Sequence, residues 1–150
     1  MKHISLHRTL AHSYLTYFIF SIIGLFADTV IGFSMTYVAY TNEIAVACFG
    51  VGTLLIIWAQ YTSRYMKHDE EIQNPYFFKG PYRYMRNPTH LGIVFLVTGY
   101  TAVSGSLVFF GVTIIAYFIS NILFQRYEAL LVRTYDGEYK AYKSKVPKIL

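Results

Sequence analysis

The longest uncharged run constrains the fold of this chain most strongly, since no Lys, Arg, Asp or Glu occurs from Thr89 to Gln125. A helix crosses the hydrocarbon core of a bilayer in about 20 residues, so this run is long enough for two crossings. Ser104-Gly105-Ser106 is the sequence within it that is typical of a turn. The run therefore predicts a helical hairpin whose first arm, Pro88 to Val103, is short.

Two earlier apolar runs each predict one further crossing. Ile44 to Thr62 has no charge, and Tyr14 to Tyr40 has the single charge of Asp28. We expect the first run to form one long helix with Asp28 in mid-span. An acid at that depth is costly without a partner. Asp28 is therefore expected to pair with a polar group such as Ser34 or Thr36, or to line the access of a substrate from the side.

The distribution of the thirteen Lys and Arg residues fixes an orientation. All of them precede the first run, lie between the second and third crossings, or follow the fourth; residues 41–43 and 104–106 have none. Four crossings put every basic residue on one side, which the positive-inside rule makes cytoplasmic. We expect an all-α integral membrane protein with about four transmembrane helices and both termini cytoplasmic. The net charge of +5 then reflects topology, and no nucleic-acid partner is expected.

The chain is interpreted as one membrane domain, 1–150, with N-terminal spans in 1–66 and a hairpin and tail in 80–150. We expect residues 67–71 to continue the second span as partly helical chain. After Asp136-Gly137 the tail keeps helical spacing of apolar residues among charges, which predicts an amphipathic helix on the cytoplasmic surface. Aromatic residues near the ends of the first two spans are interpreted as an interfacial belt: Tyr14, Tyr17, Tyr37, Tyr40, Trp58, Tyr61 and Tyr65.

Residues 80–92, Gly-Pro-Tyr-Arg-Tyr-Met-Arg-Asn-Pro-Thr-His-Leu-Gly, place cationic and helix-starting residues at the mouth of the third span. Pro88 suits the first turn of a helix. We expect the N–H groups from Thr89 to Gly92 to be unpaired, so that they favour a carboxylate or phosphate. The antiparallel fourth span brings further residues to the same depth. The sequence predicts one cytoplasmic site that contains Arg86, His90, Arg126 and Glu128 and is walled by Tyr82, Tyr84 and Tyr127.

This stretch resembles the signature of the isoprenylcysteine carboxyl methyltransferase and phospholipid methyltransferase superfamily, Gly-Pro-Tyr-Arg-x-x-Arg-His-Pro-x-Tyr-x-Gly. Residues 128–147 are similar to the closing pattern of that family, so the resemblance covers roughly residues 80–147, while the first two spans show no specific resemblance. Three positions depart from the pattern. Asn87 stands where His is usual, His90 where Tyr is usual, and Tyr127 replaces the first of two acids.

The resemblance implies a methyltransferase that binds S-adenosylmethionine at the cytoplasmic end of the hairpin, covered by the C-terminal segment. It also implies a lipidic or small membrane-associated methyl acceptor that arrives from the bilayer. Glu128 suits the ammonium of the cofactor, and Arg86 and the helix start suit its carboxylate. Candidate catalytic residues are His90, Arg126 and Glu128. Candidate cofactor-binding residues are Tyr82, Arg86, Asn87, Pro88, His90, Leu91, Gly92, Glu128 and Tyr139.

The identity of the acceptor stays open at this point. Isoprenylated cysteine, an amine headgroup, and a small thiol or phenol are all compatible with the sequence. A carboxylate acceptor needs no base, whereas for an amine or thiol His90 is the best-placed proton acceptor.

Two other classes of function are less favoured by the sequence. A sterol-type NADPH reductase shares a related Arg-x-Pro element, but usually carries an acid soon after the position of Gly92, which is absent here. A non-enzymatic transporter or assembly protein would need polar residues along several spans, and only Asp28 qualifies. His3, His7 and His12 have helical spacing but no scaffold, so no metal site is expected.

Overall fold

The structure, a computed structural model, describes residues 6–32, 41–66 and 79–148, without the side chains of 6–13, 63–66, 134–136 and 138. These residues form the helices α1 (Leu6–Ile31), α2 (Thr41–Met66), α3 (Pro88–Ser104) and α4 (Leu107–Lys145), with the short 3-10 helix η2 (Gly80–Arg83) before α3. No strand is present in these ranges, and the predicted all-α fold is confirmed. Residues 67–71, Ser34 and Thr36, for which the sequence made predictions, lie outside them.

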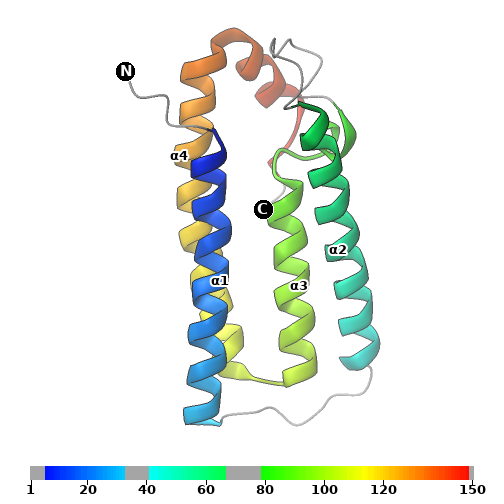
Figure 1. Ribbon diagram of the computed structural model, residues 1–150, viewed down its shortest axis with the longest axis vertical. Helices are drawn as coiled ribbons and strands as arrows, with labels where there is room; N and C mark the ends of the chain where they lie inside the picture. The colour runs from blue at the N-terminus through cyan, green and yellow to red at the C-terminus, as the bar shows by residue number, and fades with distance from the viewer. Residues whose placement is uncertain (1–5, 33–40, 67–78, 149–150) are drawn as a thin grey trace.

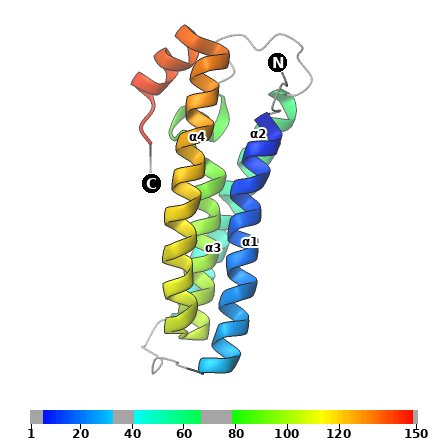
Figure 2. The same ribbon diagram turned by 90° about the vertical axis from the view of Figure 1, so that its left-hand side faces the viewer.

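The four long helices run antiparallel to their neighbours in sequence and form two layers (Figures 1 and 2). α2 packs along α3, and α1 packs along α4. The expected C-terminal hairpin exists in sequence, but α3 and α4 contact each other much less than each contacts its partner in the other half of the chain. The bundle is therefore held by α2–α3 and α1–α4 contacts more than by the hairpin.

Three of the described helices are long and apolar enough to cross a membrane, in the windows Tyr14–Ile31, Thr41–Thr62 and Leu107–Arg133. α3 has 17 residues, which at 1.5 Å per residue is about 26 Å. Its shortness agrees with the sequence, and its role as a complete fourth crossing remains a prediction. Apolar side chains cover the outside of the bundle, among them Phe26, Val46 and Phe118. The chain is a membrane protein by these features.

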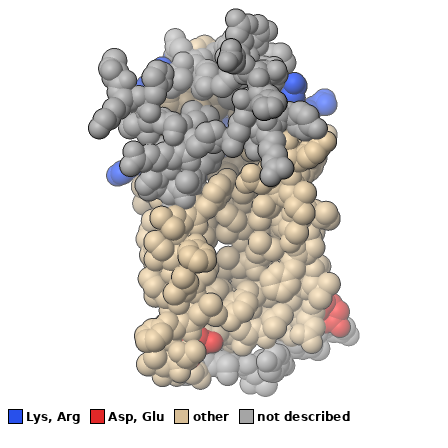
Figure 3. Space-filling view, in the orientation of Figure 1, with Lys and Arg blue, Asp and Glu red and all other residues tan. Residues whose placement is uncertain are grey.

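The described charges separate toward the two ends of the bundle, as Figure 3 shows for one face. Lys and Arg lie at the end that carries the motif of residues 80–92. Asp28, near the end of α1, and Glu43, in the first turn of α2, lie at the opposite end. Such an arrangement matches the one-sided placement of basic residues expected from the sequence.

The turn between α3 and α4 forms where the sequence predicted it. Gly105 ends α3 with φ 62°, a left-handed conformation that favours glycine. Ser106 begins α4, because its side-chain oxygen accepts a hydrogen bond from the N–H of Phe109 at 3.0 Å. The Ser106 hydroxyl also donates to the carboxylate of Asp28.

Asp28 is not in mid-span, contrary to the expectation. α1 ends at Ile31, so Asp28 lies in its last turn, at the same end of the bundle as the α3–α4 turn. Its described partner is Ser106, which is distant in sequence. The hydrogen bond from Ser106 stabilises the carboxylate in the bundle and links α1 to α4.

α4 bends where it leaves the bundle, and its last part turns back toward the start of α3 (Figures 1 and 2). Leu131 and Val146 share one buried cluster with Phe124, Tyr127, Tyr139 and Tyr142. In a straight helix Leu131 and Val146 would be about 22 Å apart. The separate amphipathic helix expected after Gly137 is therefore a continuation of α4, which bends and buries Tyr139 and Tyr142 against its own earlier part.

Glycine residues at the contact allow α2 and α3 to approach closely. A Cβ atom on Gly52 would lie 2.7 Å from the carbonyl oxygen of Gly92, and one on Gly92 would lie 2.7 Å from a carbon of Ile56. Small residues at helix contacts give membrane helices their packing energy, because lipid offers no hydrophobic drive for association. The two glycines thus set the distance between the helices that carry the motif.

Gly52→Ala tests this contact. We expect it to destabilise the protein by about 2 kcal/mol, because the methyl group must displace the α3 backbone. Gly50→Ala is the matched control, since a Cβ there meets nothing within 4 Å. Thermal unfolding in detergent measures both variants, and equal melting temperatures would contradict the proposed close contact.

Candidate functional site

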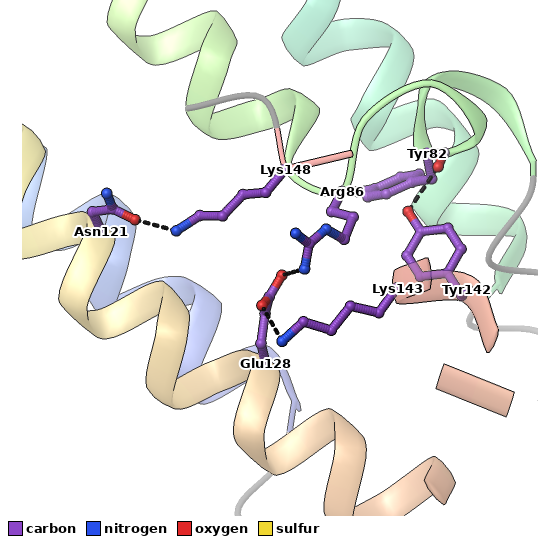
Figure 4. A network of polar contacts seen from close by, with 7 residues as sticks. All are labelled: Tyr82, Arg86, Asn121, Glu128, Tyr142, Lys143 and Lys148. Carbon is purple, nitrogen blue, oxygen red and sulfur yellow. Dashed lines mark hydrogen bonds and ion pairs between the residues drawn. The ribbon is translucent and has the colours of Figure 1, made fainter. Parts of the chain in front are cut away.

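A buried carboxylate lies at the centre of the polar network at the motif end of the bundle. Glu128, on α4, has a side chain only 5% exposed and forms ion pairs with two cations. Arg86, from the loop before α3, contacts Oε1, and Lys143, from the returning part of α4, lies 3.1 Å from Oε2 (Figure 4). The Arg86 side chain is 9% exposed and that of Lys143 is 45% exposed. Arg86 and Glu128 meet, as their equal depth on antiparallel helices predicted.

Local structure on both sides of Arg86 fixes its position. η2 places the buried Pro81 before it, and the N–H groups of Tyr84 and Met85 both donate to the Pro81 carbonyl at 3.1 Å. After it, α3 begins at Pro88. Arg86 therefore occupies a short segment held between two helices, which limits the positions open to its guanidinium.

The start of α3 differs from the expectation of free N–H groups. The Asn87 side chain accepts a hydrogen bond from the N–H of His90 at 3.3 Å, and the Asn87 carbonyl accepts one from Leu91. The expectation was wrong for these two amides, because Asn87 is an efficient N-cap residue. An anion at this place would rely on Arg86 more than on the helix start.

The returning part of α4 contributes tyrosines to the same region. The Tyr142 hydroxyl donates to the carbonyl of Tyr82 at 2.7 Å, which ties the end of the chain to η2 (Figure 4). Burial raises the pKa of Tyr82 to about 12. Burial also raises the pKa of Tyr139, with the Glu128 carboxylate adding to the rise and Arg86 opposing it. At neutral pH these phenols are hydrogen-bond donors rather than bases.

His90 lies in a second, uncharged cluster inside the bundle. The Tyr17 hydroxyl of α1 is 3.3 Å from both ring nitrogens of His90, and both residues are 3% exposed. The ring of Tyr117, on α4, lies 5.7 Å from that of His90. Ser120, one turn along α4 from Tyr117, is 0% exposed and lies beside Tyr17, but its hydroxyl makes no hydrogen bond of ordinary geometry among the described residues.

The remaining predicted site residues are not joined to these clusters in the same way. Arg126 is exposed on α4. Tyr84 is exposed and lies 6.4 Å from the Trp58 ring of α2. Tyr127 is buried beside Phe124 as a wall of the C-terminal cluster. Gly92 faces α2, as described above, and His3, His7 and His12 have no described side chains.

Sequence reasoning did not place Tyr17, Tyr117, Ser120 or Lys143 in these clusters. Tyr17 was assigned to the interfacial belt, yet it is buried. Tyr17, Gly24 and Asp28 are spaced seven and four residues apart, which puts them on one face of the helix. Because Asp28 needs a partner inside the protein, this spacing was a signal that Tyr17 also faces inward. Lys143 had no such signal, because its place depends on the bend of α4.

The sequence was also compared with known protein families. The sequence pattern of a family described as phospholipid methyltransferase matches residues 40–137. The match includes α2, for which the sequence analysis found no specific resemblance, and stops before Tyr139. No curated protein and no solved structure matches the chain.

The two cations of Glu128 should differ in their contribution to stability. Arg86→Gln leaves a buried carboxylate with one half-exposed partner, and we expect a loss of about 3 kcal/mol. Lys143→Gln removes a partly solvated ion pair and should cost less than about 1 kcal/mol. Unfolding in detergent, with exposed Arg126→Gln as control, measures the difference. Equal losses for the two variants would show that Arg86 is not the principal partner.

Proposed function

We propose, because the chain belongs to the phospholipid methyltransferase family, that this membrane methyltransferase takes its methyl group from S-adenosylmethionine. The acceptor is a lipidic or small membrane-associated molecule, methylated at the cytoplasmic face. The observation that carries the proposal is the ion pair of Arg86 and Glu128 where the motif meets α4. The family match favours neither the sterol-type reductase nor the non-enzymatic alternative.

The residues of the network fit the cofactor. Its amino acid end carries a carboxylate and an ammonium, which need a cation and an anion close together. Arg86 and Glu128 offer this pair, and the buried Nε of Arg86 has no hydrogen-bond partner within the described residues. An orphaned buried donor of this kind is costly and suits an added acceptor oxygen.

Each residue of the network has a role in this proposal. Arg86 holds the carboxylate, and Glu128 holds the ammonium in competition with Lys143, which is the more exposed of its two cations. Tyr139, Tyr142 and Tyr82 surround the network with neutral phenols. When bound, S-adenosylmethionine supplies a methyl group activated by its sulfonium. The role of the protein is then to orient the reacting atoms and to exclude water.

The other proposed residues act around this centre. Asn87 and Pro88 fix the start of α3, and Leu91 and Gly92 continue it against the rest of the bundle. Exposed Arg126 provides a cation at the interface for a phosphate or carboxylate of the acceptor. His90 takes a proton from an amine, hydroxyl or thiol acceptor.

Cofactor binding can be measured without knowledge of the acceptor. S-adenosylhomocysteine should raise the melting temperature of the detergent-purified protein, and Glu128→Gln should weaken its binding about tenfold, or about 1.4 kcal/mol. Glu43→Gln, at the far end of the bundle, is the control and should bind normally. A stabilising effect of NADPH in place of S-adenosylhomocysteine would instead favour a reductase.

The orientation is tested separately. A reporter that is active only in the cytoplasm should be active when fused after Leu150. All Lys and Arg residues lie on the side of the termini in the proposed topology, and the positive-inside rule makes that side cytoplasmic. A reporter facing the opposite compartment would overturn both the topology and the proposed cytoplasmic chemistry.

A further inference from the structure

We propose that Tyr17, His90 and Ser120 form the acceptor site of this enzyme, and that the reacting group of the acceptor is a neutral amine, hydroxyl or thiol. This inference rests on the proposed function, since it needs a methyl donor bound at the Arg86–Glu128 network. It assigns a role to α1, which lies outside the residues matched by the family.

Three helices bring this cluster together inside the bundle. Tyr17 comes from α1, His90 from α3, and Tyr117 and Ser120 from α4. The Tyr17 and His90 rings lie 5.3 Å apart, and the Tyr17 hydroxyl faces the ring edge between the two nitrogens of His90. The cluster is thus positioned where the two helix layers meet, and His90 follows Arg86 by four residues in the sequence.

The hydroxyl of Ser120 is the observation that points to a ligand. Its side chain is fully buried beside that of Tyr17, and its hydroxyl makes no hydrogen bond of ordinary geometry with any described residue. Leaving such a hydroxyl unpaired in an apolar bundle is unfavourable, and native structures rarely keep one without a reason. A nitrogen, oxygen or sulfur atom of the acceptor would satisfy it.

The charges around the cluster select the class of acceptor. Lys148 is a described cation near the cluster, because it reaches Asn121, the residue after Ser120 on α4. Its ammonium is already bound by Asn121 and lies 5.8 Å from the centre of the Phe124 ring. Arg86 is engaged by Glu128. A carboxylate would therefore be buried without a free cation, whereas a neutral protic group meets hydrogen-bonding partners of its own kind.

The chemical step balances with these residues. A lone pair on the acceptor atom X forms the new X–CH₃ bond, the X–H proton passes to the unprotonated ring nitrogen of His90, and the electron pair of the broken X–H bond stays on X. The electron pair of the broken C–S bond stays on sulfur, so the sulfonium becomes a neutral sulfide. Tyr17 is a positioning residue in this scheme, because its hydroxyl holds the ring that receives the proton.

The first experiment uses the full chain in nanodiscs with labelled S-adenosylmethionine and four probes. These are phosphatidylethanolamine (amine), phosphatidylglycerol (hydroxyl), octanethiol (thiol) and N-acetyl-S-farnesylcysteine (carboxylate). We expect methylation of at least one of the first three and none of the last. Methylation of the carboxylate alone, or of no protic probe by a protein that binds S-adenosylhomocysteine, would overturn the inference.

Ser120→Ala separates a ligand role from a structural one. Because the hydroxyl makes no hydrogen bond of ordinary geometry with a described residue, the melting temperature should change little, while KM for the methylated probe rises about fivefold or more. Ser144→Ala, an exposed serine of the same helix, is the matched control. A Ser120→Ala protein with wild-type KM would show that the hydroxyl does not contact the acceptor.

The pH dependence of turnover tests His90 and Tyr17. Loss of a general base costs about 10²–10⁴-fold, so His90→Gln should lower kcat at least 100-fold at neutral pH. The remaining rate should rise about tenfold per pH unit, because the acceptor must then lose its proton to solvent before it reacts. Tyr17→Phe should lower kcat about tenfold and move the pH of half-maximal rate, with Tyr61→Phe as control. Unchanged S-adenosylhomocysteine binding by both variants distinguishes this site from the donor site. Wild-type pH profiles would overturn the assignment, whereas failure of all proteins to bind S-adenosylhomocysteine would overturn the proposed function itself.

Discussion

The buried carboxylate of Glu128 imposes the constraint on which the rest of this end of the molecule depends. A negative charge at 5% exposure is tolerated only with close cations. Arg86 meets that need from a segment that η2 and the start of α3 hold in place, and Lys143 meets it from the far side of the bend in α4. One charged group on α4 thereby draws together three parts of the chain, and the returning segment is fixed further by the bond between Tyr142 and Tyr82.

Two polar clusters of different character lie side by side along α3. The cluster of Arg86 and Glu128 is charged and near the surface, whereas that of Tyr17 and His90 is uncharged and inside the bundle. Two of the three departures from the family pattern, Asn87 and His90, belong to these two clusters. Asn87 caps the helix and uses an amide that would otherwise face the charged cluster, and His90 puts a titratable ring into the uncharged one.

Local signals in the sequence predicted the helices and turns well, and predicted contacts across the bundle only in part. Pro88 and Gly105 bound α3 as expected, because capping and left-handed geometry are properties of a few adjacent residues. The meeting of Arg86 with Glu128 followed from equal depth on antiparallel helices. Tyr17 was misplaced because a hydropathy run does not show which face of a helix points inward. Asp28 was misplaced because the apolar run extends to Tyr40, whereas α1 ends at Ile31. Lys143 reaches the network only because α4 bends, and helical spacing in the sequence predicts a straight helix there.

The pairing of the helices has a consequence for the order in which the chain assembles. α2 and α3 are near in sequence and close over glycines, so their contact has a low loop-closure cost. α1 instead finds its main partner in α4, at the far end of the sequence. During insertion, the face of α1 that carries Tyr17 and Asp28 therefore lacks its packing partners on α4, including Ser106 and Ser120, until α4 has entered the bilayer. Catalytic competence on this view is the last property the protein acquires, since both polar clusters need α4 in place.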